Sequence, residues 1–252
     1  MAESPSLEAK GVRFGYHPKK PVVEELSVSF RLGECVGIWG ANASGKTTLL
    51  SLLSGILTPQ QGEIRLFGKP IQNFSSRERA RLIAFVPSEF SPAFPFSVEE
   101  ICFSARSLLV PDFFYENAEQ KEKITELLAT VGLKAKSRQS ILNLSGGEKQ
   151  WVSIIRGILQ DTPILLLDEP TAHLDYPHRK ILSQLLREEI CSPGKLLLFT
   201  AHDFSLLPLC QRILGVKNGK IVREENPNSF HLFSFLKEVM DFEIEKGKEE
   251  LW

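Results

Sequence analysis

The chain has 252 residues, of which 42% are apolar and 24% are charged, and its formal net charge at pH 7 is −1. This composition is typical of a globular protein, and the length allows one large domain or a core with a small subdomain. A charge near zero argues against a protein that binds nucleic acid through a broad basic surface. No apolar run approaches the roughly 18–20 residues that cross a bilayer, and the start of the chain lacks the pattern of a signal peptide. We therefore expect no export, and any link to a membrane to go through a partner.

The four cysteines of the chain, Cys35, Cys102, Cys191 and Cys210, are scattered and form no CxxC pair. Their spacing predicts neither a zinc site nor a disulfide framework. We interpret them as four buried free thiols in a reducing compartment.

Strand-like and helical runs alternate in the first part of the chain, which is typical of an α/β fold around a largely parallel sheet. The apolar patterns predict strands at 22–32, 34–39, 63–67 and 82–86, and a helix at 47–57. Two further helices are expected at 97–109, where Ser97 and Glu100 form a capping box, and at 117–131, where Gly132 follows as a C-cap.

The alternation returns in the second part of the chain, with a strand at 164–168, a helix at 177–190, a strand at 195–201, one more helix and a hairpin around Asn218-Gly219. A mostly helical block thus interrupts an α/β core. We predict a single domain over 1–252, with its core at about 8–94 and 161–225, a helical subdomain at about 95–160 and a C-terminal helical tail at about 226–252.

The stretch GANASGKT fits the phosphate-binding pattern GxxxxGK[ST], and it follows a predicted strand and opens a predicted helix. Such a loop meets phosphate oxygens with its backbone N–H groups, while the lysine neutralises the β- and γ-phosphates and the hydroxyl after it reaches Mg²⁺. An ordinary glycine-rich turn is the alternative. The candidate nucleotide-binding residues are Gly40, Ala41, Asn42, Ala43, Ser44, Gly45, Lys46, Thr47 and Thr48.

Two carboxylates follow the apolar run ILLL in the stretch PILLLDEP. A buried strand there would deliver Asp168 to the carboxyl edge of the sheet, where α/β sheets bind ligands. Asp168 with Thr47 suits a Mg²⁺ shell, since Mg²⁺ prefers oxygen ligands and keeps several waters. Glu169 could act as general base on the attacking water. The alternative is a strand end with two solvated acids.

The stretch NLSGGEKQW contains a second capping box, Ser145 with Glu148, at the start of a predicted helix. Gly146 and Gly147 leave the first amides of that helix uncovered, so its N-terminus is a second candidate anion site. We expect that this helix cannot fold back onto its own phosphate loop, and that two copies arranged head to tail would bring the two together. A plain helix cap would explain Ser145 and Glu148 but not the glycine pair.

Taken together, GANASGKTT, LSGGEKQ, ILLLDEP, TAHLD and TAHD resemble, in order and spacing, the nucleotide-binding domain of an ATP-binding cassette (ABC) protein, from about residue 11 to 225. The resemblance implies a P-loop NTPase (RecA-like) core with an antiparallel β subdomain and an inserted α-helical subdomain. It also implies ATP and Mg²⁺ as cofactors, with two ATP molecules held between the P-loop of one chain and the LSGGE stretch of the other. Hydrolysis would then reopen the dimer.

Three further residues match the family pattern. Tyr16, in VRFGY, matches the aromatic residue that stacks on adenine, although a tyrosine of the core or of an edge strand is the alternative. Asp175, in TAHLD, matches the loop that communicates across the dimer. His202, in TAHD, matches the histidine that contacts the γ-phosphate and positions water, although a lone histidine is more often structural. With Glu169 and Lys46, His202 completes the expected catalytic set.

The chain departs from the family pattern after the strand IAFVP, where most such domains have a glutamine that reaches Mg²⁺ and the attacking water. Here Ser88 stands at that position and Glu89 follows. Serine is too short to make the same contact, and Glu89 could replace it only if the loop shifted by one residue. We therefore expect hydrolysis to remain, with its rate or its coupling altered.

The stretches SSRERARLIAFVP and FPFSVEEICFSAR resemble those of importers for iron-siderophore complexes, haem or cobalamin. In these importers the second region contacts the membrane subunit, so 91–104 is expected to dock there, the alternative being packing within the core. We predict an ATP-hydrolysing transporter subunit that couples ATP-driven dimerisation to transport. Its partners would be a second copy and transmembrane permease subunits, without nucleic acid, at the cytoplasmic face of the inner or plasma membrane.

Two alternatives belong to other functional classes. A soluble ABC ATPase could act as a mechanochemical or assembly clamp, but the chain has one P-loop and neither a long coiled coil nor a zinc insertion. An ATP-binding switch with weak hydrolysis is the other. The intact Lys46, Asp168, Glu169 and His202 argue against it, while Ser88 weakly favours it.

Overall fold

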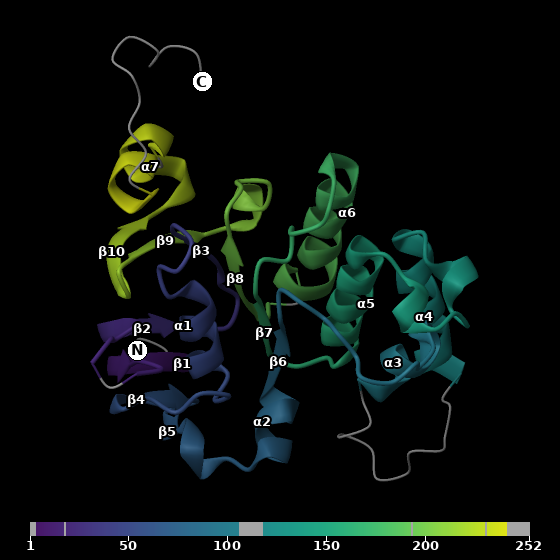
Figure 1. The fold of residues 1–252 in the computed structure, drawn as a ribbon, viewed down its shortest axis with the longest axis horizontal. Coiled ribbons are helices and arrows are strands. Elements are labelled where there is room, and N and C mark those ends of the chain that lie inside the picture. The colour runs from purple at the N-terminus through teal and green to yellow at the C-terminus, as the bar shows by residue number, and fades with distance from the viewer. Residues whose placement is uncertain (1–3, 18, 106–117, 193, 230, 241–252) are drawn as a thin grey trace.

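Two β-sheets and a layer of helices make up the computed structural model, which describes residues 4–17, 19–105, 118–192, 194–229 and 231–240 (Figure 1). The larger sheet has the strand order β10-β9-β3-β8-β7-β6, and the smaller one has the order β2-β1-β4-β5. This is the predicted α/β class, with a largely parallel core, an antiparallel sheet and a group of helices. The residue boundaries expected for the subdomains stay a prediction.

The six-stranded sheet forms the centre of the molecule. Its strands are β3 (Cys35–Trp39), β6 (Ile83–Val86), β7 (Ile164–Leu167), β8 (Leu196–Ala201), β9 (Arg212–Lys217) and β10 (Lys220–Glu225). Only β10 runs antiparallel, paired with β9 through the Asn218-Gly219 turn that the sequence predicted. Every residue of β3, β7 and β8 is buried, because both faces of the sheet are covered.

The four-stranded sheet is antiparallel and consists of β1 (Leu7–Phe14), β2 (Val23–Phe30), β4 (Gln61–Leu66) and β5 (Lys69–Pro70). Its apolar side chains share a core with helix α1 (Lys46–Leu53) and with Val36 and Ile38 of β3. Because side chains of a strand alternate between faces, Cys35 and Trp39 of the same strand belong to the other core, under the helices.

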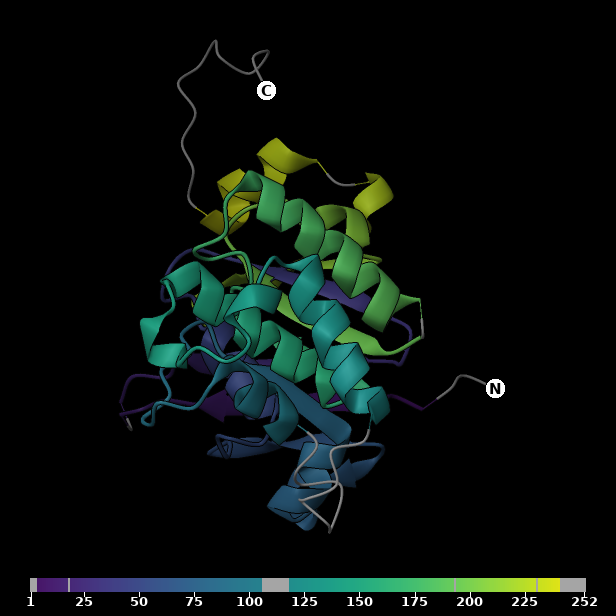
Figure 2. The same ribbon diagram turned by 90° about the vertical axis from the view of Figure 1, so that its right-hand side faces the viewer.

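The remaining helices are α2 (Ser76–Leu82), α3 (Val98–Ser104), α4 (Ala118–Thr130), α5 (Gly146–Leu159), α6 (Tyr176–Leu186) and α7 (Leu232–Met240). Helices α4, α5 and α6 lie in front of the sheets in Figure 2. Short 3₁₀ turns span Ile71–Asn73, Lys134–Lys136, Ile141–Asn143, Leu207–Leu209 and Pro227–Ser229, and a π-helical turn spans Arg187–Cys191.

Several helix ends differ from the sequence predictions. Helix α1 ends at Leu53 rather than at 57, because Gly55 adopts a left-handed conformation with φ of 74°. The helix expected at 97–109 ends at Ser104, and its last positions lie outside the described residues. The helix predicted after 201 was wrong. A turn stands there instead, because the Asp203 carboxylate accepts a hydrogen bond from the Ser205 amide and Pro208 follows.

We predict that Leu198→Ala lowers the free energy of unfolding by about 2–5 kcal/mol, since Leu198 of β8 is fully buried between the two layers. Leu32→Ala is the matched control, because Leu32 is 43% exposed, and its effect should stay within about 0.5 kcal/mol. Urea unfolding followed by circular dichroism measures both. Equal effects of the two substitutions would contradict this packing.

Candidate functional site

The loop of residues 40–45 leads from the carboxyl end of β3 directly into α1. The loop carries the GxxxxGK[ST] pattern, and its last residue, Gly45, caps the helix with φ of 104°. Lys46 is 4% exposed, and its ammonium donates hydrogen bonds to the carbonyl oxygens of Gly40 (2.9 Å) and Ala41 (3.1 Å). Burial lowers the pKa of Lys46, while the carboxylates of Glu169 and Asp168 oppose that shift. The lysine is thus held beside its own loop.

The glycines of this loop are required by space and by backbone conformation. A Cβ at Gly40 would lie 2.2 Å from the carbonyl oxygen of Val216, and one at Gly45 would lie 2.7 Å from that of Val22. Inside the turn, the Ser44 hydroxyl is buried and, among the described residues, has no hydrogen-bond partner. A buried, unpaired donor next to free helix amides fits an anion such as a phosphate group.

Asp168 lies at the end of β7, and hydroxyl groups join it to helix α1 and to the neighbouring strand β8. Thr47 donates a hydrogen bond to Asp168 Oδ1 (3.1 Å), and Thr200 donates to the same oxygen (2.7 Å). Asp168 is 1% exposed. Its carboxylate and the Thr47 hydroxyl, next to the anion-fitting loop, form the kind of oxygen donor set that Mg²⁺ prefers, so these residues fit that ion.

Glu169 is held in an unusual conformation beside Asp168. Its φ is 49°, a left-handed value that a non-glycine residue rarely adopts, and its amide donates to the Thr200 hydroxyl (2.8 Å). His202 Nε2 lies 2.5 Å from Glu169 Oε1. A strained backbone of this kind persists where the surrounding structure fixes it, and here it directs the carboxylate toward the histidine at the edge of the sheet.

Sequence reasoning missed two residues that support this edge. Thr200 bridges Asp168 and Glu169 as described above. Asp203 accepts hydrogen bonds from Thr171 (2.6 Å) and from the Ser205 amide (2.8 Å), and Arg179 lies 3.4 Å away. Burial acts to raise the pKa of Asp203, but the hydrogen bonds from Ser205 and Thr171 outweigh it and hold the pKa below its usual value. Thr200 and Asp203 are the first and last residues of the TAHD stretch, so that motif was the sequence signal that could have identified them.

The second candidate anion site is the start of α5. Ser145 and Glu148 form the predicted capping box, and Lys136 lies 2.5 Å from Glu148. A Cβ at Gly147 would lie 2.8 Å from the carbonyl oxygen of His173, so packing within the chain explains this glycine. A Cβ at Gly146 would have only an ordinary contact, at 3.9 Å. Nothing in the chain's own packing thus requires Gly146, which is exposed together with Ser145.

The two glycine-rich helix starts are not joined within one chain. Helix α1 follows β3, whereas α5 packs against β6 and β7, and β8 lies between β3 and β7. Figure 1 shows α1 and α5 on different sides of these strands. In the part of the chain that the structure describes, no hydrogen bond connects residues 40–48 with residues 145–148. The structure therefore agrees with the expectation that the two motifs stay apart in the monomer.

The remaining candidate residues lie around these two motifs. Tyr16 is 62% exposed and its hydroxyl is 3.4 Å from that of Thr48, so its ring stands beside the phosphate loop. Asp175 caps α6 by accepting a hydrogen bond from the His178 amide (3.1 Å), which lowers the pKa of Asp175. Ser88 is half-buried and Glu89 is exposed, directly after β6.

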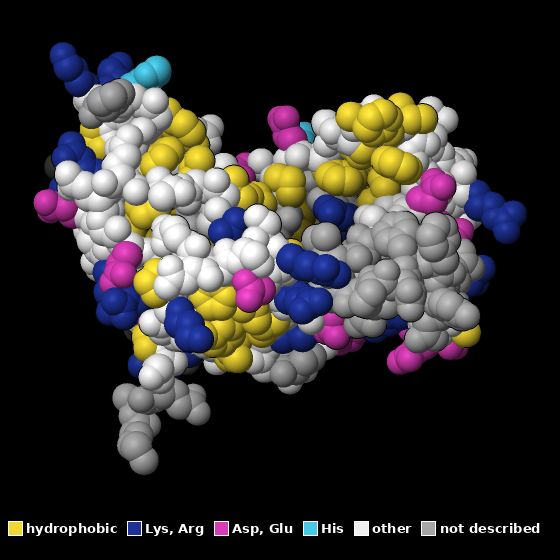
Figure 3. All heavy atoms as spheres, turned by 90° about the horizontal axis from the view of Figure 1, so that it is seen from below, with side chains coloured by type: hydrophobic (Ala, Val, Ile, Leu, Met, Phe, Trp, Pro, Cys, Tyr) yellow, Lys and Arg dark blue, Asp and Glu magenta, His cyan; other side chains and the backbone are white. Residues whose placement is uncertain are grey.

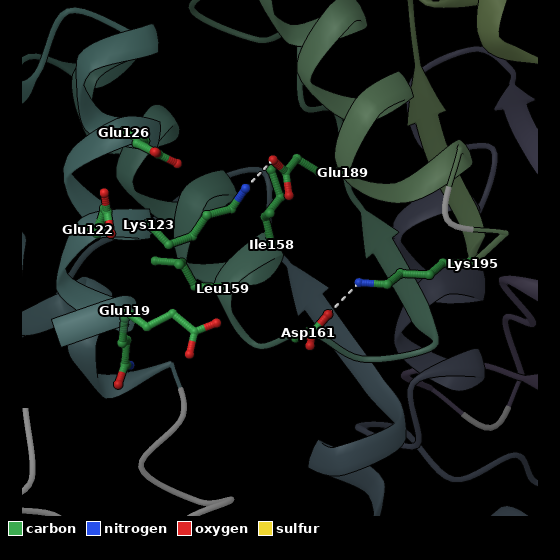
Figure 4. Close-up of a pocket in the computed structure, with 10 residues that line it drawn as sticks. Glu119, Glu122, Lys123, Glu126, Ile158, Leu159, Asp161, Glu189 and Lys195 are labelled. Atoms are coloured by element: carbon green, nitrogen blue, oxygen red, sulfur yellow. Dashed lines mark hydrogen bonds and ion pairs between the residues drawn. The ribbon is translucent and has the colours of Figure 1, made fainter. Parts of the chain in front are cut away.

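A separate cavity of about 340 Å³ lies at the opposite edge of the sheet, where β7 and β8 begin (Figure 4). Its lining includes five carboxylates and two lysines. Lys123 of α4 pairs with Glu189 (2.5 Å), and Lys195 pairs with Asp161 (2.6 Å). Because ligands of open α/β sheets bind at the carboxyl edge, these pairs are better explained as links between the helical layer and the sheet.

Comparison with known proteins places this geometry in a family. The family model described as ABC transporter matches residues 23–172. The chain belongs to the ABC transporter family. As in that family, it is an ATP-binding ATPase subunit. None of its described helices has the length and apolar character needed to span a membrane.

Two relatives of this ABC ATPase have named roles. It is 32% identical to the hemin import ATP-binding protein HmuV of Streptomyces coelicolor, over 90% of this chain and 80% of that protein. It is 33% identical to the ferric enterobactin transport ATP-binding protein FepC of Escherichia coli, over 90% of this chain and 84% of that protein. A solved structure, the dimeric post-hydrolysis state of the ATP-binding cassette MJ0796 bound to ADP and phosphate, has a TM-score of 0.77 at 26% identity, covering 89% of this chain and all of that one.

We predict that Thr200→Val lowers ATP turnover at least about tenfold, because displacement of a reacting group by 1 Å can cost about 10²-fold. The substitution keeps the shape of the side chain but removes the hydroxyl between Asp168 and Glu169. Thr200→Ser should restore turnover. Thr162→Val is the matched control, since Thr162 is equally buried but bonds only to the Ile164 carbonyl. Similar rates for the valine and serine variants at position 200 would contradict the positioning role.

Proposed function

We propose that two copies of this chain bind two ATP molecules between them, each held by the P-loop of one copy and the start of α5 of the other. The separation of these two motifs within one chain is the observation that carries the proposal. Gly146 adds support, because it is exposed and a Cβ there would meet only His173, in an ordinary contact of 3.9 Å. The MJ0796 cassette, which is dimeric in a post-hydrolysis state bound to ADP and phosphate, supports a dimer of such chains.

Each residue of the nucleotide site has a separate role in this proposal. The amides of residues 40–48 and the Ser44 hydroxyl would hold the phosphates, and Lys46 would leave its own loop carbonyls to neutralise them. Tyr16 would stack on the adenine ring. Thr47 and Asp168 would hold Mg²⁺, which supplies charge neutralisation for the departing phosphate. Asp175, exposed at the start of α6, would face the partner copy.

The Glu169–His202 pair would prepare the water for attack. Glu169 would accept the proton of the water, and His202, 2.5 Å from it, would fix the direction of its carboxylate and contact the γ-phosphate. The usual loop glutamine is replaced by Ser88, so Glu169 and His202 would align the water without that side chain. We expect hydrolysis to remain, with an altered rate or coupling.

The transported cargo would be an iron-siderophore complex, haem or cobalamin, taken up by import. Support comes from the named roles of HmuV and FepC. A membrane permease would dock at 91–104, where Phe94 and Phe96 are 64% and 50% exposed and their rings lie 6.0 Å apart, edge to face. Figure 3, which views the side where β5 and α2 lie in Figure 1, shows basic side chains beside apolar ones. Such docking would hold the protein at the cytoplasmic face of the membrane, without nucleic acid.

We predict that two substitutions in the nucleotide site affect different steps, one ATP binding and the other ATP hydrolysis. Lys46→Ala should weaken ATP binding at least about tenfold, because a charge-assisted contact to phosphate is lost. Glu169→Gln should bind ATP normally but hydrolyse it about 10²–10⁴-fold more slowly, which is the usual contribution of a general base. It should also accumulate as an ATP-bound dimer in size-exclusion chromatography with light scattering.

The matched control for the second substitution is Glu189→Gln, a carboxylate of similar exposure that pairs with Lys123 outside the site. Its turnover should equal that of the unmodified protein. Normal hydrolysis by Glu169→Gln would show that the general base is assigned wrongly.

We predict that Phe94→Ser with Phe96→Ser breaks the docking to a permease without changing ATP turnover of the isolated protein. The measurement is purification of the tagged protein from its own cells in mild detergent, with mass spectrometry of the chains that come with it. The unmodified protein should bring a polytopic membrane protein in nearly equal amount. Val222→Ser is the control, because Val222 is an exposed apolar residue on β10, at the far edge of the sheet. If the double variant and the control brought down equal amounts of the membrane protein, this docking surface would be refuted.

A further inference from the structure

Trp39, the last residue of β3, connects the strand before the phosphate loop to the chain after β8. Its indole Nε1–H donates a hydrogen bond to the carbonyl oxygen of Asp203 (2.9 Å). Trp39 is fully buried, where an indole N–H ordinarily needs a partner. Gly40, the first residue of the phosphate loop, follows Trp39, and Asp203 follows His202. One side chain therefore links the strand that leads into the phosphate loop to the residue next to the histidine.

His202 lies between two contacts that the same tryptophan makes. On one side, Trp39 is paired with Ala201 in the parallel register of β3 and β8. On the other side, the Trp39 indole binds the carbonyl oxygen of Asp203. His202 is the single residue between Ala201 and Asp203, so its backbone is fixed relative to the end of β3. Its ring then meets the Glu169 carboxylate at 2.5 Å.

Aromatic neighbours fix the direction in which the indole points. The Phe204 ring is stacked on it, with 5.5 Å between the ring centroids and 14° between the planes, and the Phe199 ring of β8 meets it edge to face at 5.6 Å. A Cβ at Gly37 would lie 2.1 Å from the Trp39 ring, so this glycine leaves the space that the indole occupies. The hydrogen bond to Asp203 is thus supported by packing from β3, from β8 and from the loop after β8.

Asp203 is held from a second direction by its carboxylate. Thr171, in the segment after β7, donates a hydrogen bond to that carboxylate (2.6 Å), and Arg179 of α6 lies 3.4 Å from it. The Ser205 amide also donates to it (2.8 Å). Of the hydrogen bonds and ion pairs that the structure describes for Asp203, only the one from Trp39 comes from β3. The indole is therefore the contact that sets this residue relative to the phosphate loop.

We propose that Trp39 is a positioning residue for ATP hydrolysis, which holds His202 at a fixed place relative to the phosphate loop. The inference rests on the role proposed above for His202 and adds the side chain that keeps it in place. Trp39 touches no reacting atom, and its effect passes through the Asp203 carbonyl oxygen. Loss of the indole N–H would remove that contact and let the His202 segment shift, which slows the reaction while the phosphate loop still binds ATP.

The test removes the N–H and keeps the shape of the ring. Trp39 is replaced in the full-length protein by 3-benzothienylalanine, in which a sulfur atom takes the place of the indole N–H, through suppression of an amber codon. Trp39→Phe is the second variant. The rate of a single turnover is measured with protein in excess over radiolabelled ATP and with Mg²⁺ present, and the Kd for ATP is measured by equilibrium binding. Both variants should hydrolyse ATP about tenfold more slowly, with a Kd within about twofold of the unmodified protein.

Trp151 of α5 is the matched control. It is 2% exposed, and its indole N–H is buried without a hydrogen-bond partner among the described residues. Trp151→Phe and 3-benzothienylalanine at position 151 therefore remove no hydrogen bond, and their turnover should stay within about twofold of that of the unmodified protein. Thermal unfolding followed by circular dichroism shows how far each variant is destabilised. Similar destabilisation with different rates separates positioning from packing.

A double-mutant cycle tests whether the effect passes through His202. His202→Ala alone should slow turnover, and Trp39→Phe should slow it no further in that background. Three results would overturn the positioning role. They are normal turnover with 3-benzothienylalanine at position 39, a loss of ATP affinity as large as the loss of rate, and the full loss of rate from Trp39→Phe in the His202→Ala background.

The same cycle separates this inference from the proposed function. If His202→Ala hydrolyses ATP at the normal rate, the role proposed for the histidine is wrong and the positioning role of Trp39 falls with it. If His202→Ala is slow and the 3-benzothienylalanine variant at position 39 is normal, only the role of Trp39 is wrong.

Discussion

The first amides of a helix have no partner in their own helix, and the proposed function depends on two such helix starts. The start of α1 is curled around the buried Ser44 hydroxyl and the Lys46 ammonium, and the start of α5 lies open at Ser145 and Gly146. Both suit an anion, but strand β8 and the layer around it separate them within the chain. In the proposed dimer, a second copy with its opposite motif facing each site would satisfy both helix starts with the same phosphate groups.

The parallel sheet does the rest of the positioning. Parallel strands end at one edge, so β3, β7 and β8 deliver the phosphate loop, the Asp168-Glu169 pair and His202 to one place although they are far apart in sequence. Thr200 then fixes Asp168 and Glu169 together through one hydroxyl group. The opposite edge instead carries the ion pairs of Glu189 with Lys123 and of Asp161 with Lys195.

Local patterns predicted the residues whose roles depend on short-range geometry. Three kinds of feature depend only on residues that are a few positions apart, so the sequence pattern predicts them. They are the phosphate loop, the capping boxes at Ser97 and Ser145, and the hairpin at Asn218-Gly219. Features that depend on long-range pairing were missed. The hydrogen bonds that join Thr200 to Asp168 and Glu169 arise only when β7 and β8 pair, and Thr171 reaches the Asp203 carboxylate from a distant part of the sequence. The sequence therefore predicted the fold class, but it did not predict these supporting contacts.

The most direct test of the cross-chain site is a distance between two copies. One copy carries a spin label on Asn143→Cys, beside the start of α5, and the other carries a label on Asn42→Cys, in the phosphate loop. Both copies also carry Glu169→Gln, which slows hydrolysis, and Cys191→Ser with Cys210→Ser, so that these half-buried cysteines take no label. Pulsed electron paramagnetic resonance of the mixed copies then reports only distances between chains. Our account predicts that ATP produces a new, short distance that is absent without nucleotide. An unchanged distance distribution with ATP bound would contradict it.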